Sequence, residues 1–331
     1  MSSERDGGYV GGIVSHAAYG DLPRCIASLS GQSRPPREIL VVDTGVEPAQ
    51  LVALERDHPD VRFELRTNRG WGAGVNRILA LVEARHPDAE FALLLNPDVE
   101  LDADFAEVLL RAMAECPTAA LASGKLLRPG RAVLDSAGIR LPRHRRPRDR
   151  GSEEPDLGRY ERRERVFGVS GAALLVRRSA LGDLSLGGEL VDEDFFAYQD
   201  DTDLCWRAHL LGWDVLYEPA ARAVHGRRWR RDRRSQIEVS VRRHSFKNHY
   251  LQIIKNEQAS DLVRNLPWLL AWEVLRLGFA LVADRAVLPA YRDALREAPA
   301  AWAKRREIQR RRAARGLPRR SDSGHAIGAV L

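Results

Sequence analysis

The sequence predicts an α/β fold in which helices flank a mostly parallel sheet, with a helical extension at the C-terminal end. Two patterns carry this prediction. Short apolar runs alternate with helical periodicity over the first 125 residues, and these runs are continuously apolar, as in strands buried on both faces. After residue 237 the periodicity is helical throughout. The length of 331 residues exceeds a usual domain of roughly 100–200 residues, so a main domain with an appended unit is expected.

The elements follow in order along the chain. Asp21 is placed to cap the first helix, and Pro23 suits its first turn because a missing N–H is harmless there. The polar, arginine-rich stretch 142–165 is read as a mobile loop. Strands are expected at 9–15, 38–42, 61–65, 91–95, within 119–141 and 166–176, and at 215–217 and 221–224; helices at 49–56, 75–85, 105–116, 201–211, 237–255, 262–283 and 291–312. The predicted divisions are a disordered start (1–8), a main domain (9–234), a helical region (235–315) and a disordered tail (316–331).

Composition excludes several classes of protein. Hydrophobic residues make up 44% of the chain, which excludes a disordered polymer. Three scattered cysteines exclude a disulfide scaffold or a cysteine zinc site, and the start lacks the long apolar stretch of a signal peptide, so the cytoplasm is expected. Residues 226–331 hold 24 Lys and Arg against 10 Asp and Glu, whereas residues 1–225 hold 28 against 36. This asymmetry suggests that residues 1–225 carry the chemistry and that residues 226–331 attach the protein to something anionic.

Polar residues follow two of the expected strands. Asp43 closes one strand, and Asn96-Pro97-Asp98 closes another. Ligands of parallel sheets bind outside the carboxyl ends of the strands, where a carboxylate such as Asp98 suits Mg²⁺ or Mn²⁺. The alternatives are a helix cap or turn residue for Asp43 and an Asx-type turn for Asp98.

A glycine-rich segment, NRGWGAGVN at 68–76, opens a helix. Its glycines allow close approach of backbone to a ligand, and amides at a helix start favour phosphate. The position and spacing differ from a dinucleotide fingerprint, so NAD binding is not expected. An ordinary glycine-rich turn is the alternative.

The segment 192–203 contains six acidic residues interleaved with aromatic ones. Because exposed aromatics are costly, this segment should pack and bring carboxylates into a cleft where their pKa values rise. A helix cap at Asp200 or Asp201 explains one or two of the acids but not six. His225 follows an apolar strand and is either a structural histidine or a ligand.

Taken together, the motifs VVD, NRGWGAGVN, LNPDV, VSGAALLVRR, the acidic segment through YEP and the terminal histidine resemble inverting glycosyltransferases of family 2 with the GT-A fold, rhamnosyltransferase-like members above all. The resemblance covers about residues 10–256. It implies that Asp201 is the catalytic base, with Asp200 in place of the family's glutamate, and that Asp98 and His225 hold a divalent cation, Mg²⁺ or Mn²⁺. Residues implied to bind the donor are Ser15, Asp43 (at the base), Asn68, Gly70, Gly74, Asn76, Asn96, Arg227 and Trp229, and those implied to bind the acceptor are Gly171 and Tyr198.

The sequence departs from the family pattern at three places. Ser15-His16-Ala17 stands where the family often has Tyr-Asn, which alters any contact made there. Asn96-Pro97-Asp98 stands where the family has its metal-binding Asp-x-Asp (DxD) element, so Asn96 removes one carboxylate from the metal site. Asp200 shortens one side chain of the Glu-Asp pair by a methylene.

The resemblance implies transfer of a sugar from a nucleoside diphosphate to a saccharide or lipid-linked saccharide acceptor in cell-envelope polysaccharide synthesis. It favours L-rhamnose from dTDP-rhamnose. Asp201 would take the proton of the attacking hydroxyl, giving inversion without a covalent intermediate. The alternatives are a galactosyl-, glucosyl- or mannosyltransferase of the same fold, or a non-catalytic scaffold with an anion-binding C-terminus.

The basic C-terminal part allows more than one partner. The arginine cluster 227–234 could contact nucleic acid, but no nucleic-acid-binding fold surrounds it, and a loop that closes over the donor diphosphate is expected instead. Glu273 and Arg276 interrupt the most apolar stretch, 266–283, so an amphipathic helix at an anionic membrane surface is predicted rather than a spanning helix. A helix packed on the main domain or in a homodimer is the alternative.

Overall fold

The computed structural model describes residues 8–45, 47–227 and 237–317. Of the residues predicted to bind the donor, Trp229 lies outside the described residues. The same holds for most of the predicted disordered ends and for the arginine cluster after Arg227.

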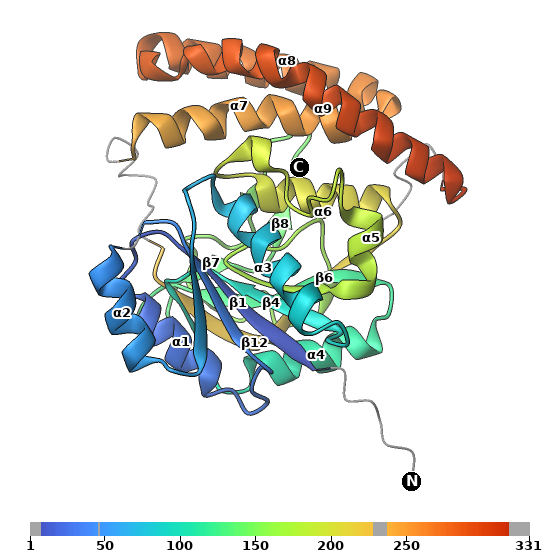
Figure 1. The fold of residues 1–331 in the computed structure, drawn as a ribbon. Helices are drawn as coiled ribbons and strands as arrows, with labels where there is room; N and C mark the ends of the chain where they lie inside the picture. Colours follow the sequence, from blue (N-terminus) through green and yellow to red (C-terminus); the bar gives the residue numbers. More distant parts are fainter. Residues whose placement is uncertain (1–7, 46, 228–236, 318–331) are drawn as a thin grey trace.

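A mixed sheet of ten strands forms the centre of the catalytic part of the chain (Figure 1). Its main path runs β10-β12-β6-β11-β4-β1-β2-β3, while β5 pairs with β12 and β7 with β6. The four strands from β4 to β3 are parallel, as predicted, but β11 runs antiparallel between β4 and β6. The bounds are β1 Tyr9–Ser15, β2 Ile39–Asp43, β3 Val61–Leu65, β4 Phe91–Leu95, β5 Val99–Leu101, β6 Ala119–Leu127, β7 Leu134–Ser136, β10 Glu164–Arg165, β11 Ala173–Arg177 and β12 Asp214–His225. A separate two-stranded sheet joins β8 Ile139–Arg140 to β9 Arg148–Asp149.

Helices cover both faces of the sheet because successive residues of its strands point to opposite sides. In β1, Val10 and Val14 pack in one apolar cluster with α3, whereas Tyr9 and Ile13 pack in the other with α1 and α4. The helices of this part are α1 Leu22–Ser30, α2 Pro48–Asp57, α3 Trp71–Arg85, α4 Phe105–Glu115, α5 Leu181–Leu184 and α6 Asp200–Leu210. Asp21 occupies the N-cap position of α1 but makes no side-chain capping bond, since its carboxylate pairs with Arg24.

The segment 142–165, predicted to be mobile, is packed through ion pairs. Lys125, whose side chain is fully buried, contacts Asp156 at 3.1 Å and also contacts Glu161. Arg145 and Glu257 form a second buried pair that ties the segment to the C-terminal helices. Charged residues that look solvated in the sequence, Arg145 among them, therefore have structural partners.

Three long helices, α7 Val239–Asn256, α8 Ala259–Val282 and α9 Pro289–Ala314, form a layer across the α6 end of the sheet domain (Figure 1). The ammonium group of Lys255 in α7 is buried between the carboxylates of Asp192 and Asp203. Asn256 donates to Asp203 as well, at 2.6 Å. Acids of the 192–203 segment thus anchor the C-terminal layer.

Candidate active site

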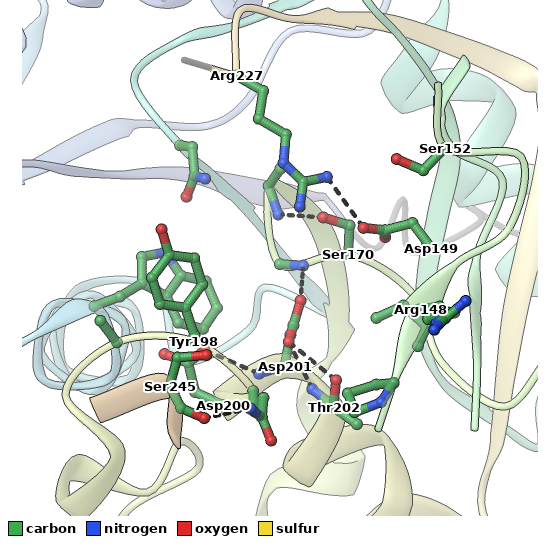
Figure 2. A pocket seen from close by; sticks show the side chains of 18 of the residues that line it. Arg148, Asp149, Ser152, Ser170, Tyr198, Asp200, Asp201, Thr202, Arg227 and Ser245 are labelled. Atoms are coloured by element: carbon green, nitrogen blue, oxygen red, sulfur yellow. Dashed lines mark hydrogen bonds and ion pairs between the residues drawn. The ribbon is translucent and has the colours of Figure 1, made fainter. Parts of the chain in front are cut away.

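A cavity of about 720 Å³ opens at the carboxyl ends of β4 and β12 and the start of α6. Its walls bring together residues that are about a hundred positions apart in the chain, and Figure 2 shows Asp200, Asp201 and Arg227 around it. Eight of the residues predicted for the site line this cavity: Asn96, Asp98, Gly171, Tyr198, Asp200, Asp201, His225 and Arg227.

Strand pairing places His225 beside Asp98. The antiparallel register of β12 on β5 sets His225 opposite Val99, the residue after Asp98. Nε2 of His225 lies 3.5 Å from Oδ1 of Asp98, and Nδ1 lies 2.7 Å from Oδ2 of the buried Asp135. Burial acts to lower the pKa of His225, but the two carboxylates outweigh it and raise that pKa to about 9. Burial acts to raise the pKa of Asp98, and His225 more than offsets it, so the pKa is lowered.

This donor set fits a divalent cation that is shared with a diphosphate. Within the described ranges, no group of three or more His, Cys, Asp and Glu side chains is arranged to hold a metal ion alone. Asp98 and His225 would thus supply two ligands, and Mg²⁺ commonly takes the rest of its oxygens from substrate phosphates and water. Asp135 on the far ring nitrogen of His225 matches the carboxylate that commonly orients a metal-binding histidine.

Arg227 lines the same cavity as Asp98 and His225. Its guanidinium is 3.0 Å from Asp149 and 3.3 Å from Asp135. Arg128 also pairs with Asp135, at 2.8 Å. Asp135 and Asp149 are isolated acids in the sequence, so no local motif marks them, and the sequence analysis missed both.

Asp201, at the start of α6, is held at the cavity wall by two backbone amides, one from the segment before β11 and one from α6 itself. Gly171 N–H donates to its Oδ2 at 3.1 Å, and Thr202 N–H donates to its Oδ1 at 2.7 Å (Figure 2). Burial raises the pKa of Asp201 above its ordinary value. Burial and the charge of Asp201 raise the pKa of Asp200 to about 7. The pair therefore combines a fixed carboxylate with a raised proton affinity, which suits a general base.

The turn that precedes these two acids is strained and clamped from α7. Phe196, Tyr198 and Gln199 have φ values of 60°, 68° and 68°, in the left-handed region that non-glycine residues rarely adopt. The buried Asn248 donates through its single amide nitrogen to the carbonyls of Phe195, Ala197 and Tyr198, at 2.8, 2.9 and 2.8 Å. Sequence reasoning missed Asn248 because a lone amide in a polar helix carries no signal.

The predicted donor residues on β1 and β2 form a separate polar spot. Ser15 and Asp43 are register partners at the carboxyl ends of these strands. Asp43 accepts Gly45 N–H through Oδ1 at 2.7 Å, but Ser15 Oγ and Asp43 Oδ2 are buried without a hydrogen-bond partner among the described residues. Neither residue lines the cavity. Two unsatisfied buried oxygens at a strand end are compatible with the predicted contact to a ligand.

The glycine-rich segment reaches the cavity through Trp71, while its predicted donor residues Asn68, Gly70, Gly74 and Asn76 have packing contacts and do not line it. Asn68 accepts Gly70 N–H at 2.9 Å, and Asn76 exchanges hydrogen bonds with the backbone of Val191 at 2.8 and 3.0 Å. Gly70 has a φ of 92°, and a Cβ there would lie 2.1 Å from the Phe196 carbonyl oxygen. A Cβ on Gly74 would lie 2.5 Å from Val14. These glycines are required for close packing, and a donor role for the segment stays a prediction.

Sequence comparison identifies relatives of this chain. Residues 12–184 match Glycosyl transferase family 2. The N-acetylglucosaminyl-diphospho-decaprenol L-rhamnosyltransferase of Mycobacterium tuberculosis (strain ATCC 25618 / H37Rv) is 33% identical over 231 residues, which are 64% of this chain and 74% of that protein.

Solved structures share the fold at low identity. GalNAc-T7 with UDP, GalNAc and Mn²⁺ matches with a TM-score of 0.60 and 12% identity over 94% of this chain, which spans about half (55%) of that protein. Staphylococcus aureus TarS 1-349 with UDP matches with a TM-score of 0.55 and 15% identity, and the match covers 95% of this chain and 93% of that one. The mannosyltransferase PcManGT of Pyrobaculum calidifontis with GDP-Man and Mn²⁺ matches with a TM-score of 0.51 and 18% identity. That match covers 96% of this chain and 83% of the mannosyltransferase chain.

These solved neighbours have the GT-A fold, so the predicted fold class is confirmed. The family match covers more than half of the chain and includes β2, which ends at Asp43, and the turn between β4 and β5 that holds Asn96 and Asp98. The chain therefore belongs to glycosyl transferase family 2 and is an inverting glycosyltransferase.

Proposed function

We propose that this enzyme transfers L-rhamnose from dTDP-rhamnose to a lipid-linked saccharide in the cytoplasm, as a step of cell-envelope polysaccharide synthesis. The name of the Mycobacterium tuberculosis relative supports this sugar and an acceptor that carries a diphosphate and a lipid. The observation that carries the proposal is the shared cavity, which is lined by Asp201 together with Asp98, His225 and Arg227.

The donor diphosphate binds where positive charge and metal ligands meet. Asp98 and His225 would hold a divalent cation, Mg²⁺ or Mn²⁺, and Mn²⁺ in two solved neighbours supports this assignment. When bound, that cation would neutralise charge on the departing diphosphate. Arg227 contributes a fixed guanidinium to the same oxygens, and Asp149 and Asp135 hold it in place.

Asp201 carries the proton transfer. Its carboxylate accepts the proton of the acceptor hydroxyl while that oxygen bonds to the anomeric carbon and the bond from carbon to the diphosphate oxygen breaks. Because the hydroxyl approaches opposite to the leaving group, the configuration inverts. A positioned base of this kind contributes about 10²–10⁴-fold to the rate. Gly171 and Tyr198 form part of the acceptor wall next to Asp201, and Asn96 lines the donor side.

The nucleotide base is assigned to the spot formed by Ser15 and Asp43. A thymine or uracil ring offers an N–H donor and carbonyl acceptors, and these can satisfy the buried oxygens that lack a partner among the described residues.

A transfer assay with purified full-length protein tests the proposal. The donors are dTDP-rhamnose, UDP-galactose, UDP-glucose and GDP-mannose, each with Mn²⁺ and with EDTA, and the acceptor is N-acetylglucosaminyl diphosphate on a short prenyl chain. We expect transfer from dTDP-rhamnose alone and its loss with EDTA. Faster transfer from another donor would overturn the assigned sugar, and no transfer from any donor would favour a non-catalytic scaffold.

A further inference from the structure

The outer face of α8 is apolar and unusually accessible. Large side chains on it include Val263, Leu270, Val274, Leu275, Leu281 and Val282, of which Val274 is 72% and Val282 is 87% exposed. Arg264 is the one exposed charged residue of this helix, all of which the structure describes. A continuous apolar surface of this kind marks an interaction site rather than ordinary surface.

The two charges that interrupt the apolar run in sequence face inward. Glu273 accepts hydrogen bonds from the hydroxyls of Tyr250 and Tyr291, each at 2.8 Å. The buried Arg276 donates to the Phe246 carbonyl at 3.0 Å, and its guanidinium lies 3.9 Å from the centre of the Phe246 ring. The charges therefore attach α8 to α7 and α9 and leave the outer face without them.

We infer that α8 lies flat in the interface of an anionic lipid bilayer, with its outer face among the acyl chains. By length and composition alone this helix is also able to cross a membrane. Crossing would separate Glu273 and Arg276 from their partners and place both charges in hydrocarbon, which is costly. Lying flat keeps every one of these contacts and buries the same apolar face.

Charge favours lipid over a second copy of the chain as the occupant. Residues 237–317 hold 16 Lys and Arg against 8 Asp and Glu. Arg143, Arg264 and Arg285 are exposed on or beside α8. A dimer through this face would bring two positive surpluses together, whereas an anionic leaflet attracts them at about 1 kcal/mol per basic residue near the surface.

One segment connects α8 to the catalytic cavity. His144 stacks on Trp272 of α8 at 4.4 Å between ring centres, and Arg143 lies 5.7 Å from the centre of the Trp268 ring. Arg146 and Arg148, two and four residues after His144, line the cavity. A bilayer under α8 thus brings the cavity edge to headgroup level, where these arginines can meet the diphosphate of a membrane-held acceptor. This last step rests on the proposed function.

Vesicle sedimentation of the full-length chain tests the inference. The probes are vesicles of phosphatidylglycerol with phosphatidylcholine and vesicles of phosphatidylcholine alone. The test variant is Leu270→Glu/Val274→Glu, and the matched control is Val52→Glu/Leu157→Glu, which changes two equally exposed apolar residues elsewhere. We expect salt-sensitive binding to the anionic vesicles, a decrease of about tenfold or more in the test variant, and wild-type binding in the control.

Three results would overturn the inference. They are absence of binding by the wild-type chain, equal binding by the test variant, and resistance of the bound protein to alkaline carbonate, which indicates a spanning helix. Sedimentation equilibrium would identify a dimer through this face if only the test variant becomes monomeric. Transfer to a water-soluble acceptor is measured in parallel, because the test variant should keep it. Vesicle binding without transfer would refute the proposed function alone.

Discussion

Replacing Asn248 by alanine tests whether α7 holds the catalytic turn in place. The change removes one amide nitrogen that serves three buried carbonyls. Its two hydrogens amount to two full hydrogen bonds, and each buried carbonyl left without a donor costs about 1–3 kcal/mol. Removing Asn248 Oδ1, which has no partner among the described residues, offsets part of that cost. We expect the free energy of unfolding to fall by about 2–4 kcal/mol.

The effect on turnover should be separable from the effect on donor binding. Relaxation of the left-handed residues before α6 displaces Asp201, and a shift of about 1 Å at a reacting group costs about 10²-fold in rate. Asp98, between β4 and β5, and His225, at the end of β12, are untouched, so the Kd of the donor should stay within about twofold.

Two further variants make this prediction decisive. Asn248→Asp keeps the shape but turns an oxygen toward the carbonyls, so it should lose at least as much stability and turnover as Asn248→Ala. Asn265→Ala removes a buried asparagine of α8 that donates only to the Asp261 carbonyl, one turn away. Urea unfolding and steady-state kinetics provide the readouts. Losses in Asn248→Ala no larger than those in Asn265→Ala would refute the clamp.

Three other predictions follow from the site. The rate should fall toward acid pH as the coupled acids gain a proton, because a base must be ionised and burial raises the pKa of Asp201 above its ordinary value. Asp200→Asn should move this limb of the pH–rate profile to lower pH by removing a like charge; an unmoved limb would exclude coupling between the two acids. Gly70→Ala should reduce the free energy of unfolding by about 2 kcal/mol or more because of its positive φ and the backbone clash, whereas Gly182→Ala, with open space around it, should be neutral or mildly stabilising in thermal unfolding. Asp135→Asn should weaken Mn²⁺ affinity about 10–100-fold in an electron paramagnetic resonance titration with dTDP, and unchanged affinity would contradict its orienting role.

The parallel half of the fold was predictable because its strands are buried on both faces. Continuous apolar runs fix β1 and β4 at their observed bounds, whereas β3 (VRFEL) is only partly buried at the edge of the sheet. The start of α3 was set too late, at residue 75 instead of Trp71, because Gly72 and Gly74 lower the helical signal. The antiparallel insertion of β11 between β4 and β6 depends on pairing between distant segments, which periodicity does not report.

The site was predictable where a residue closes a strand or opens a helix. Asp98, Asp201 and His225 all line one cavity, as the family resemblance implied. Asp135 and Asn248 act through residues far along the chain, so only their spatial neighbours reveal what they do. The reading of 142–165 as a loop missed β9, β10 and the ion pairs with Lys125 and Glu257, because all of these depend on partners outside the segment, and its mobility stays a prediction.

The exchange Asp201→Asn shows whether Asp201 is the catalytic base, because it removes the carboxylate and preserves the shape of the side chain. Rapid-quench transfer with saturating donor and acceptor, together with calorimetric titration of dTDP-rhamnose, separates chemistry from binding. Asp194→Asn, a change in the same acidic segment outside the cavity, is the matched control and should keep its turnover. We predict a rate about 10²–10⁴-fold lower with donor affinity unchanged. A transfer rate for Asp201→Asn equal to that of the control would contradict the account.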